Sequence, residues 1–288
     1  LRVHHTGFDD GAHAESPDNP VWQQQAGKAG PLYVAESCTA CHPNNGRALP
    51  PAPGTALDRF VVRVGDASGN PDPLLGAVLQ PHGTSGAGEG DVVLKRWIER
   101  RGLRCPRFAF RGPVPARYSV RMPPPLVGLG LLEAIPEDAI VARADPDDRD
   151  GDGISGRAHV VTDPESGVPR LGRFGWKAAQ ATLRHQAAAA FRTDMGVTSS
   201  VFRDPDCGSA QSGCGASGVE IRDRDLDDLA AYLALLGMQA RRDSDDPVVR
   251  RGEDLFASTG CAGCHVPTYV TTPFHPFAEL AGQTIHPY

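Results

Sequence analysis

The sequence has no apolar run of the length that a membrane-spanning helix needs, so nothing in it predicts an anchor in a bilayer. It also lacks an excess of positive charge, because 29 Lys and Arg residues face 35 Asp and Glu residues and the formal net charge is −6. The basic residues are dispersed, which argues against nucleic acid as a partner. The acidic balance suggests a partner with a basic face, or simply a solvated acidic surface.

An initiator Met is absent as well, since the chain begins at Leu1. We expect a processed N-terminus from which a signal peptide has been removed, although a cloned fragment would begin in the same way. Hydrophobic residues make up 40% of the 288 residues, enough for the core of one large or two ordinary domains. The 33 Gly and 26 Pro residues are scattered and predict long, ordered loops.

Four of the seven cysteines lie in two copies of C-x-x-C-H, at residues 38–42 and 261–265. Two thiols at this spacing reach the two vinyl groups of one haem, and the adjacent His becomes the proximal iron ligand. Zinc ribbons separate their cysteine pairs by roughly 15–20 residues, and a thioredoxin-like pair does not need the His. We therefore predict two covalent haem c groups. Their attachment residues are Cys38, Cys41, His42, Cys261, Cys264 and His265.

Covalent haem attachment of this kind takes place on the oxidising side of a membrane, which predicts a periplasmic or extracellular protein. A disulfide is then expected among the remaining cysteines. Cys207 and Cys214 flank a short Gly/Ser loop and are the predicted pair. Cys105 is left over, and we expect a buried, inert thiol.

The pattern of apolar residues predicts a mainly α fold. An amphipathic helix is expected over residues 225–238, with leucines on one face and acidic residues in its first turn. Short strands are expected at residues 60–64 and 117–120, with one possible helix near Val92–Arg100. Residues 55–125 are interpreted as a partly β insertion.

These elements predict a cytochrome c-like haem domain at residues 1–242, followed by the start of a second such domain at residues 243–288. Residues 247–260 resemble the opening helix of that second domain, directly before its haem motif. Only 23 residues follow His265, so we expect the second domain to be truncated, or completed from elsewhere.

Residues 145–156 hold five Asp in a short stretch. Asp148, Asp150 and Asp152 fit D-x-D-x-D-G, with Gly153 at the sharp turn, and alternating carboxylates can surround one hard cation. His159 stands where an EF-hand has a bidentate Glu, so this is not an EF-hand. The stretch predicts one bound Ca²⁺, the alternative being a solvated acidic turn.

Several segments together resemble the family of di-haem oxidoreductases described as peroxidases and formerly called thiol oxidoreductases. The resemblance runs from about Gly30 to Tyr288 and includes both haem motifs. Its other segments are Pro123–Glu137, the Asp-rich loop ending at Arg157, Gly172–Ala178 and Asp194–Thr198. Members of this family continue past the point that matches Tyr288.

A weaker resemblance reaches the bacterial di-haem cytochrome c peroxidases. It implies that Trp176 is an electron bridge and that Gln186 and Asp194 are groups of the distal pocket, with Met195 following Asp194. The sequence departs from that pattern in having Lys177-Ala178 in place of Asp-Gly and Asp194 in place of Glu.

The distal side of the first haem has several candidate ligands. They are Met195, Met122, His82, His159 and His185. Met195 leads because of its place in Asp-Met-Gly, and sequence alone does not choose among the histidines. His4, His5 and His13 lie in a polar segment and are expected to be solvated rather than ligands. Glu133, in an apolar run, is a second acid/base candidate or a backbone-bonding residue.

The predicted function is a di-haem oxidoreductase, peroxidase-like, that reduces a small oxidant such as hydrogen peroxide. A small cytochrome or cupredoxin would donate the electrons. Two alternatives stay open: a non-catalytic electron-transfer subunit of a larger exported assembly, and an oxygenase with the same two-haem layout.

Overall fold

The computed structural model describes residues 2–208, 211, 214–215 and 217–287. The chain divides into two compact units, which are treated separately below. Unit 1 consists of residues 1–126 and 184–230, and unit 2 of residues 127–183 and 231–288. None of the helices in the described part of the chain combines the length and the apolar composition that crossing a membrane requires.

The prediction of a mainly α fold is wrong. Helices account for only 23% of the residues that the structure describes and strands for 20%, arranged in several small sheets. Many of these strands are two or three residues long. Strands of this length are too short to show an alternating pattern of apolar and polar residues, so local periodicity does not predict them.

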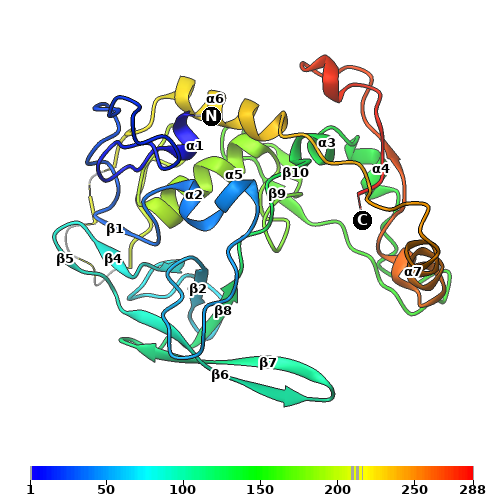
Figure 1. Cartoon of the computed structure of the whole chain (residues 1–288), viewed down its shortest axis with the longest axis horizontal. Coiled ribbons are helices and arrows are strands. Elements are labelled where there is room, and N and C mark those ends of the chain that lie inside the picture. The colour runs from blue at the N-terminus through cyan, green and yellow to red at the C-terminus, as the bar shows by residue number, and fades with distance from the viewer. Residues whose placement is uncertain (1, 209–210, 212–213, 216, 288) are drawn as a thin grey trace. The chain divides into compact units, whose positions relative to one another are not determined.

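Unit 1 contains the N-terminal helices and most of the strands (Figure 1). Its helical segments are α1 (Arg2–His5), α2 (Cys38–Cys41), η1 (Pro43–Asn45), α5 (Leu183–Ala190), the π-helical turn η2 (Phe191–Met195) and α6 (Asp223–Ala234). Its strands are β1 (Leu32–Tyr33), β2 (Val61–Gly65), β3 (Val78–Leu79), β4 (His82–Gly83), β5 (Gly86–Ala87), β6 (Asp91–Arg100), β7 (Leu103–Arg111) and β8 (Arg117–Arg121). The first residue of α5 and the last four residues of α6 belong to unit 2.

The strands of unit 1 form three antiparallel sheets, ordered β1-β4-β5, β3-β2-β8 and β6-β7. Strands β2 and β8 confirm the strands expected near residues 60–64 and 117–120, and they pair with each other. The helix considered near Val92–Arg100 is wrong, because this segment is strand β6. Its apolar residues include the β-branched Val92, Val93 and Ile98, which favour strands.

Two apolar regions hold unit 1 together. The first joins β2, β3 and β6 around nine buried residues, with Trp97, Phe108 and Phe110 packed against it from the β6–β7 hairpin. The second is helical. There the rings of Phe8 and Phe191 lie 5.4 Å apart, and Leu226 and Leu229 of α6 are buried. Helix α6 confirms the amphipathic helix expected at residues 225–238, although it ends earlier.

Unit 2 is built from short elements on either side of the second haem motif. They are α3 (Leu129–Glu133), α4 (Glu137–Val141), β9 (Val160–Thr162), β10 (Pro169–Leu171), α7 (Pro247–Ser258), η3 (Cys261–Gly263), β11 (Tyr269–Val270), η4 (Ala278–Leu280) and β12 (Thr284–Ile285). Strands β9 and β10 form one hairpin, and β11 pairs with β12. Helix α7 is the helix expected before the second motif, with Asp246 capping its N-terminus and Pro247 in its first turn.

Candidate functional site

The two C-x-x-C-H motifs fold in the same way, each as a single helical turn. In the first, the backbone N–H of His42 donates to the carbonyl of Cys38 at 2.9 Å. In the second, the N–H of His265 donates to the carbonyl of Cys261, also at 2.9 Å. This turn brings both thiols and the imidazole of each motif onto neighbouring positions, as attachment of one haem requires.

The side chain of His42 is oriented by the carbonyl oxygen of Pro124, which lies 2.9 Å from Nδ1. A carbonyl oxygen only accepts, so Nδ1 must carry the hydrogen and Nε2 keeps its lone pair. Burial lowers the pKa of His42, which favours the neutral ring. A neutral imidazole held through Nδ1, with Nε2 available, fits an axial iron ligand.

The thiols of the first motif are shielded. Burial raises the pKa of Cys38 to about 12, and burial also raises the pKa of Cys41, with the carboxylate of Asp194 adding to both shifts. Neither thiol is in a disulfide. A raised pKa keeps these groups as neutral thiols while nothing is bound to them, and they lie one helical turn apart with an imidazole next to them. The donor set therefore fits thioether attachment of a haem.

The segment Asp194-Met195-Gly196 lies against the strand region that precedes the first motif. The carbonyl of Asp194 accepts from the backbone N–H of Val34 at 2.7 Å, and that of Met195 from the N–H of Gly30 at 2.9 Å. Gly196 has a φ of +69°, and a Cβ there would lie 2.3 Å from a backbone oxygen of β1. The glycine thus permits the close approach that sets Asp194 and Met195 beside the first motif.

Asp194 has a setting that suits proton transfer. Burial raises its pKa to about 6, against a hydrogen bond from Thr193 and the positive charge of Arg63, which lower it. The Thr193 hydroxyl lies 2.7 Å from Oδ1 of Asp194 and 2.9 Å from the carbonyl of Ala189. One hydroxyl proton can serve only one acceptor at a time. Thr193 can donate to the ionised carboxylate, or accept from the protonated one while donating to Ala189.

Gln186 and Met195 are the other predicted residues in this region of unit 1. Oε1 of Gln186 is buried and has no hydrogen-bond partner among the residues that the structure describes. Met195 is 4% exposed. An acceptor left without a partner by the protein fits a site that is completed by a bound group or water. Their roles, like that of Asp194, stay predictions.

The remaining distal candidates are in different surroundings. Met122 packs against the β core of unit 1, and His185 is buried against Phe202. His82 is exposed on β4, while His159 is exposed in unit 2 and hydrogen-bonded to the carbonyl of Lys177. None of these surroundings points to the first motif as directly as those of Met195.

The expectation that the N-terminal histidines are solvated is wrong for two of them. His4 and His5 are 1% and 4% exposed, because α1 packs against α2, the turn of the first haem motif. The pKa of His4 is lowered to about 3, mainly by burial and in part by the neighbouring charges of His5 and His42. The rings of His5 and His13 stack at 5.2 Å. The polar composition of residues 1–30 concealed this packing.

Two acidic residues near Asp194 were missed by sequence reasoning. The pKa of Glu89 is raised to about 7, mainly by burial and in part by the charges of Asp206 and Asp72. Burial also raises the pKa of Asp206, whose charge acts on both Glu89 and Asp194. No motif marks these carboxyl groups, since they are far apart in sequence and only folding gathers them.

Trp176 and Glu133 both lie in unit 2. Trp176 is 59% exposed, and its role as an electron bridge stays a prediction. The carboxylate of Glu133 accepts from the backbone N–H of Leu183, the first residue of α5, at 2.7 Å. Glu133 therefore bonds to the backbone, one of its two expected roles, and its acid/base role stays a prediction.

The second haem motif is far more open than the first. Cys261, Cys264 and His265 are all exposed, and the ring of Phe256 lies 5.7 Å from that of His265. Neither thiol is in a disulfide. The residues present fit one face of a haem site, with Phe256 as an aromatic neighbour.

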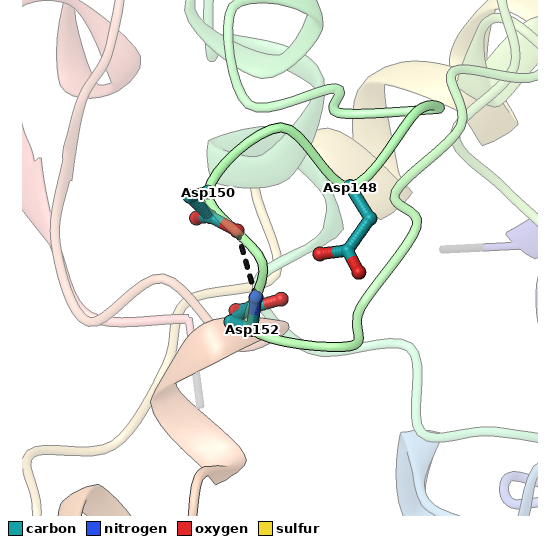
Figure 2. Close-up of side chains that lie close together, drawn as sticks. All are labelled: Asp148, Asp150 and Asp152. Atoms are coloured by element: carbon teal, nitrogen blue, oxygen red, sulfur yellow. Dashed lines mark hydrogen bonds between the residues drawn. The ribbon is translucent and has the colours of Figure 1, made fainter.

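The Asp-rich loop of unit 2 brings three carboxylates together. Ligand oxygens of Asp148, Asp150 and Asp152 lie within 4.8 Å of one another. Figure 2 shows the three side chains on this loop. Backbone N–H groups of the loop donate to these side chains, including that of Gly153 to Asp148 at 3.1 Å. The loop also touches the second motif, since a Cβ at Gly263 would lie 2.9 Å from the side chain of Ile154. Calcium binding here stays a prediction.

The predicted disulfide is confirmed, since Cys207 and Cys214 are bonded. Cys105 is a free thiol, half-buried on strand β7. It is therefore less enclosed than the buried thiol that was expected.

Comparison with known proteins identifies the family. The sequence model of the family described as "di-haem oxidoreductase, putative peroxidase" matches residues 115–288, more than half of the chain. The match includes the second haem motif, Asp194, Gln186 and Trp176, whereas the first motif precedes it. No curated protein and no solved structure matches the sequence significantly. The chain belongs to the di-haem oxidoreductase family.

Proposed function

We propose that this di-haem oxidoreductase is an exported c-type cytochrome, periplasmic or extracellular, that reduces a small oxidant such as hydrogen peroxide. The overall reaction would be H₂O₂ + 2 H⁺ + 2 e⁻ → 2 H₂O. Cys38, Cys41 and His42 would hold one haem, and Cys261, Cys264 and His265 the other. The Cys207–Cys214 disulfide supports an oxidising compartment.

The observation that carries the peroxidase proposal is the setting of Asp194. Its carboxyl has a pKa near 6, lies within electrostatic reach of both thiols of the first motif, and has a threonine partner for either protonation state. Peroxide reduction needs a group that takes a proton from one peroxide oxygen and returns it to the other. A carboxyl that titrates near neutral pH can do both.

The other residues of the first site would bind the haem and orient the oxidant. A bound haem would supply an iron that exchanges single electrons and can accept an oxygen ligand. His42 and Met195 are the residues that would hold the haem iron in the resting protein. Gln186 would accept a hydrogen bond from the oxidant through Oε1.

Electrons would come from a small donor protein, a cytochrome or a cupredoxin. The exposed side chains of the second motif make it the proposed point of entry. Trp176 would then help to pass electrons toward the first site.

The test is spectroscopic and catalytic. Low-temperature EPR of the purified holoprotein, fully oxidised and then half-reduced, should show a high-spin ferric signal in at least one state. Peroxide consumption with a small-molecule reductant should follow. Two low-spin signals that persist through half-reduction, without turnover, would refute the peroxidase proposal.

A second function is favoured by the exposure of the second motif. Cys261, Cys264 and His265 lie on the surface, and a neighbouring subunit could cover them. In this alternative the protein is a non-catalytic electron-transfer subunit of a larger exported assembly. The persistent low-spin spectrum described above would support it.

We further propose one Ca²⁺ at Asp148, Asp150 and Asp152. Calcium should raise the thermal unfolding midpoint of the holoprotein, because a ligand at about 100 times its Kd stabilises the native state by about 2.7 kcal/mol. The double variant D150N/D152N should lose this response, whereas D254N, which alters an exposed aspartate of α7, should keep it. Equal midpoints with calcium and with a chelator would contradict the site.

A further inference from the structure

Strands β6 and β7 form a two-stranded hairpin in unit 1 that is joined by a tight turn (Figure 1). The turn residues Arg101 and Gly102 have φ values of +52° and +74°, as a two-residue hairpin turn requires. The register pairs Arg96 with Arg107, Ile98 with Cys105, and Arg100 with Leu103. Directly paired residues project from the same face of a hairpin, so these three pairs share one face.

The opposite face of the hairpin is attached to the protein. Trp97, Phe108 and Phe110 lie on that side and pack against the β core of unit 1. The guanidinium of Arg104 lies 5.0 Å from the centre of the Trp97 ring, on the same side. The hairpin is therefore held at a fixed orientation by its inner face.

The outer face presents arginines around apolar side chains. Arg96, Arg100 and Arg107 are exposed, Leu103 is 68% exposed, and Ile98 is half-buried. We call the six residues of the three pairs the outer hairpin face. Arginine and aliphatic side chains in this mixture are typical of protein interfaces, where Arg is enriched and Lys depleted.

The charge of the hairpin is opposite to that of the chain. Residues 95–111 contain seven Arg or Lys and one Glu, a formal charge of +6, in a chain whose net charge is −6. Charged residues on exposed strands can protect them from aggregation, but mixed signs would serve that purpose equally well. Charge of a single sign at this density instead favours an anionic partner.

We propose that the outer hairpin face docks an acidic protein through carboxylates that pair with Arg96, Arg100 and Arg107 around Leu103 and Ile98. A protein fits better than a lipid surface, because the turn carries Arg100 and Arg101 and the exposed side chain of Leu103 beside it is a small apolar area to insert into a bilayer. The net charge of the whole chain suggests a basic partner, whereas the positive charge of this surface favours an acidic one. That this partner is the electron donor rests on the proposed function.

The experiment measures binding of the holoprotein to an acidic cupredoxin that combines carboxylates with an apolar patch on its docking face. A basic cytochrome c is the mismatched probe. Isothermal titration calorimetry at low and at moderate salt should show binding to the acidic probe that weakens as salt rises, and weaker binding to the basic probe.

Three variants test the face. R96E/R100E/R107E should weaken binding to the acidic probe by about tenfold or more, and R96K/R100K/R107K, which keeps the charge, should retain most of it. The control R224E/R242E/R251E makes the same change of charge at exposed arginines outside the hairpin and should bind within about twofold of the unaltered protein. Circular dichroism and haem content verify folding of each variant.

Several outcomes would overturn the proposal. One is unchanged binding by R96E/R100E/R107E, or an equal loss in the control. Another is binding to anionic phospholipid vesicles without binding to the acidic protein. A third is self-association in sedimentation that R96E/R100E/R107E abolishes. Peroxide turnover with a small-molecule reductant is measured separately, so failure of the proposed function is distinguishable from failure of this docking face.

Discussion

Replacing Cys38 and Cys41 with alanine should remove one covalent haem and leave the other attached, and replacing Cys261 and Cys264 should do the reverse. The reason is that each motif places its own two thiols and its own histidine on one helical turn. Each haem is then anchored independently by two thioether bonds. The pyridine haemochrome assay, combined with the mass of the denatured protein, counts the haems.

The control for this experiment is C105A, which removes a free thiol outside both motifs and should keep both haems. The doubly deficient variant, altered at all four motif cysteines, should carry none. If either C38A/C41A or C261A/C264A retained two covalent haems, the attachment sites proposed here would be wrong. If the unaltered protein carried only one, the motif without a haem would need another explanation.

Replacing Asp194 with asparagine should lower the rate constant for peroxide reduction by about 10²- to 10⁴-fold, the usual contribution of a general acid–base group. Glutamate at this position keeps a carboxyl and should retain part of the activity. The haem content and the visible spectrum of both variants should match those of the unaltered protein. A rate within about twofold of normal for D194N would exclude Asp194 as the proton-transfer group.

The proposed role of Asp194 also predicts how the rate of peroxide reduction depends on pH. The ionised form of Asp194 must accept the first proton from peroxide, and its pKa is raised to about 6. Activity should therefore fall as the pH is lowered through about 6, and this fall should be absent in D194N.

The raised pKa of Asp194 also means that folding favours the protonated carboxyl, so stability is lost as the pH rises through 6. D194N should accordingly unfold at a higher temperature than the unaltered protein at pH 8.

Part of this protein could be read directly from its sequence. The strands near residues 60–64 and 117–120 and helices α6 and α7 were predictable, because their apolar spacing or β-branched composition is local. The pairing of β2 with β8 across more than fifty residues was not. The mainly α prediction failed because short strands such as β1, β4 and β9 span only two or three residues, too few to show an alternating pattern.

The hairpin shows how tertiary contacts override a local pattern. Val92–Arg100 groups apolar and charged residues in short runs, a pattern that is compatible with a short helix as well as a strand. The segment forms a strand because it pairs with Leu103–Arg111 and because Trp97 and Phe108 pack on the β core. The same pairing separates the arginines of the outer face from the aromatic residues of the inner face.

The sequence by itself determined the two C-x-x-C-H motifs, the Asp-rich loop and the disulfide pair, because attachment chemistry and ligand spacing are local properties of the chain. Only the tertiary structure decided that His4 is buried against α2 and that Asp194 lies beside the thiols of the first motif with a pKa near 6. Burial and electrostatic coupling depend on which distant segments meet. No spacing rule along the chain encodes that information.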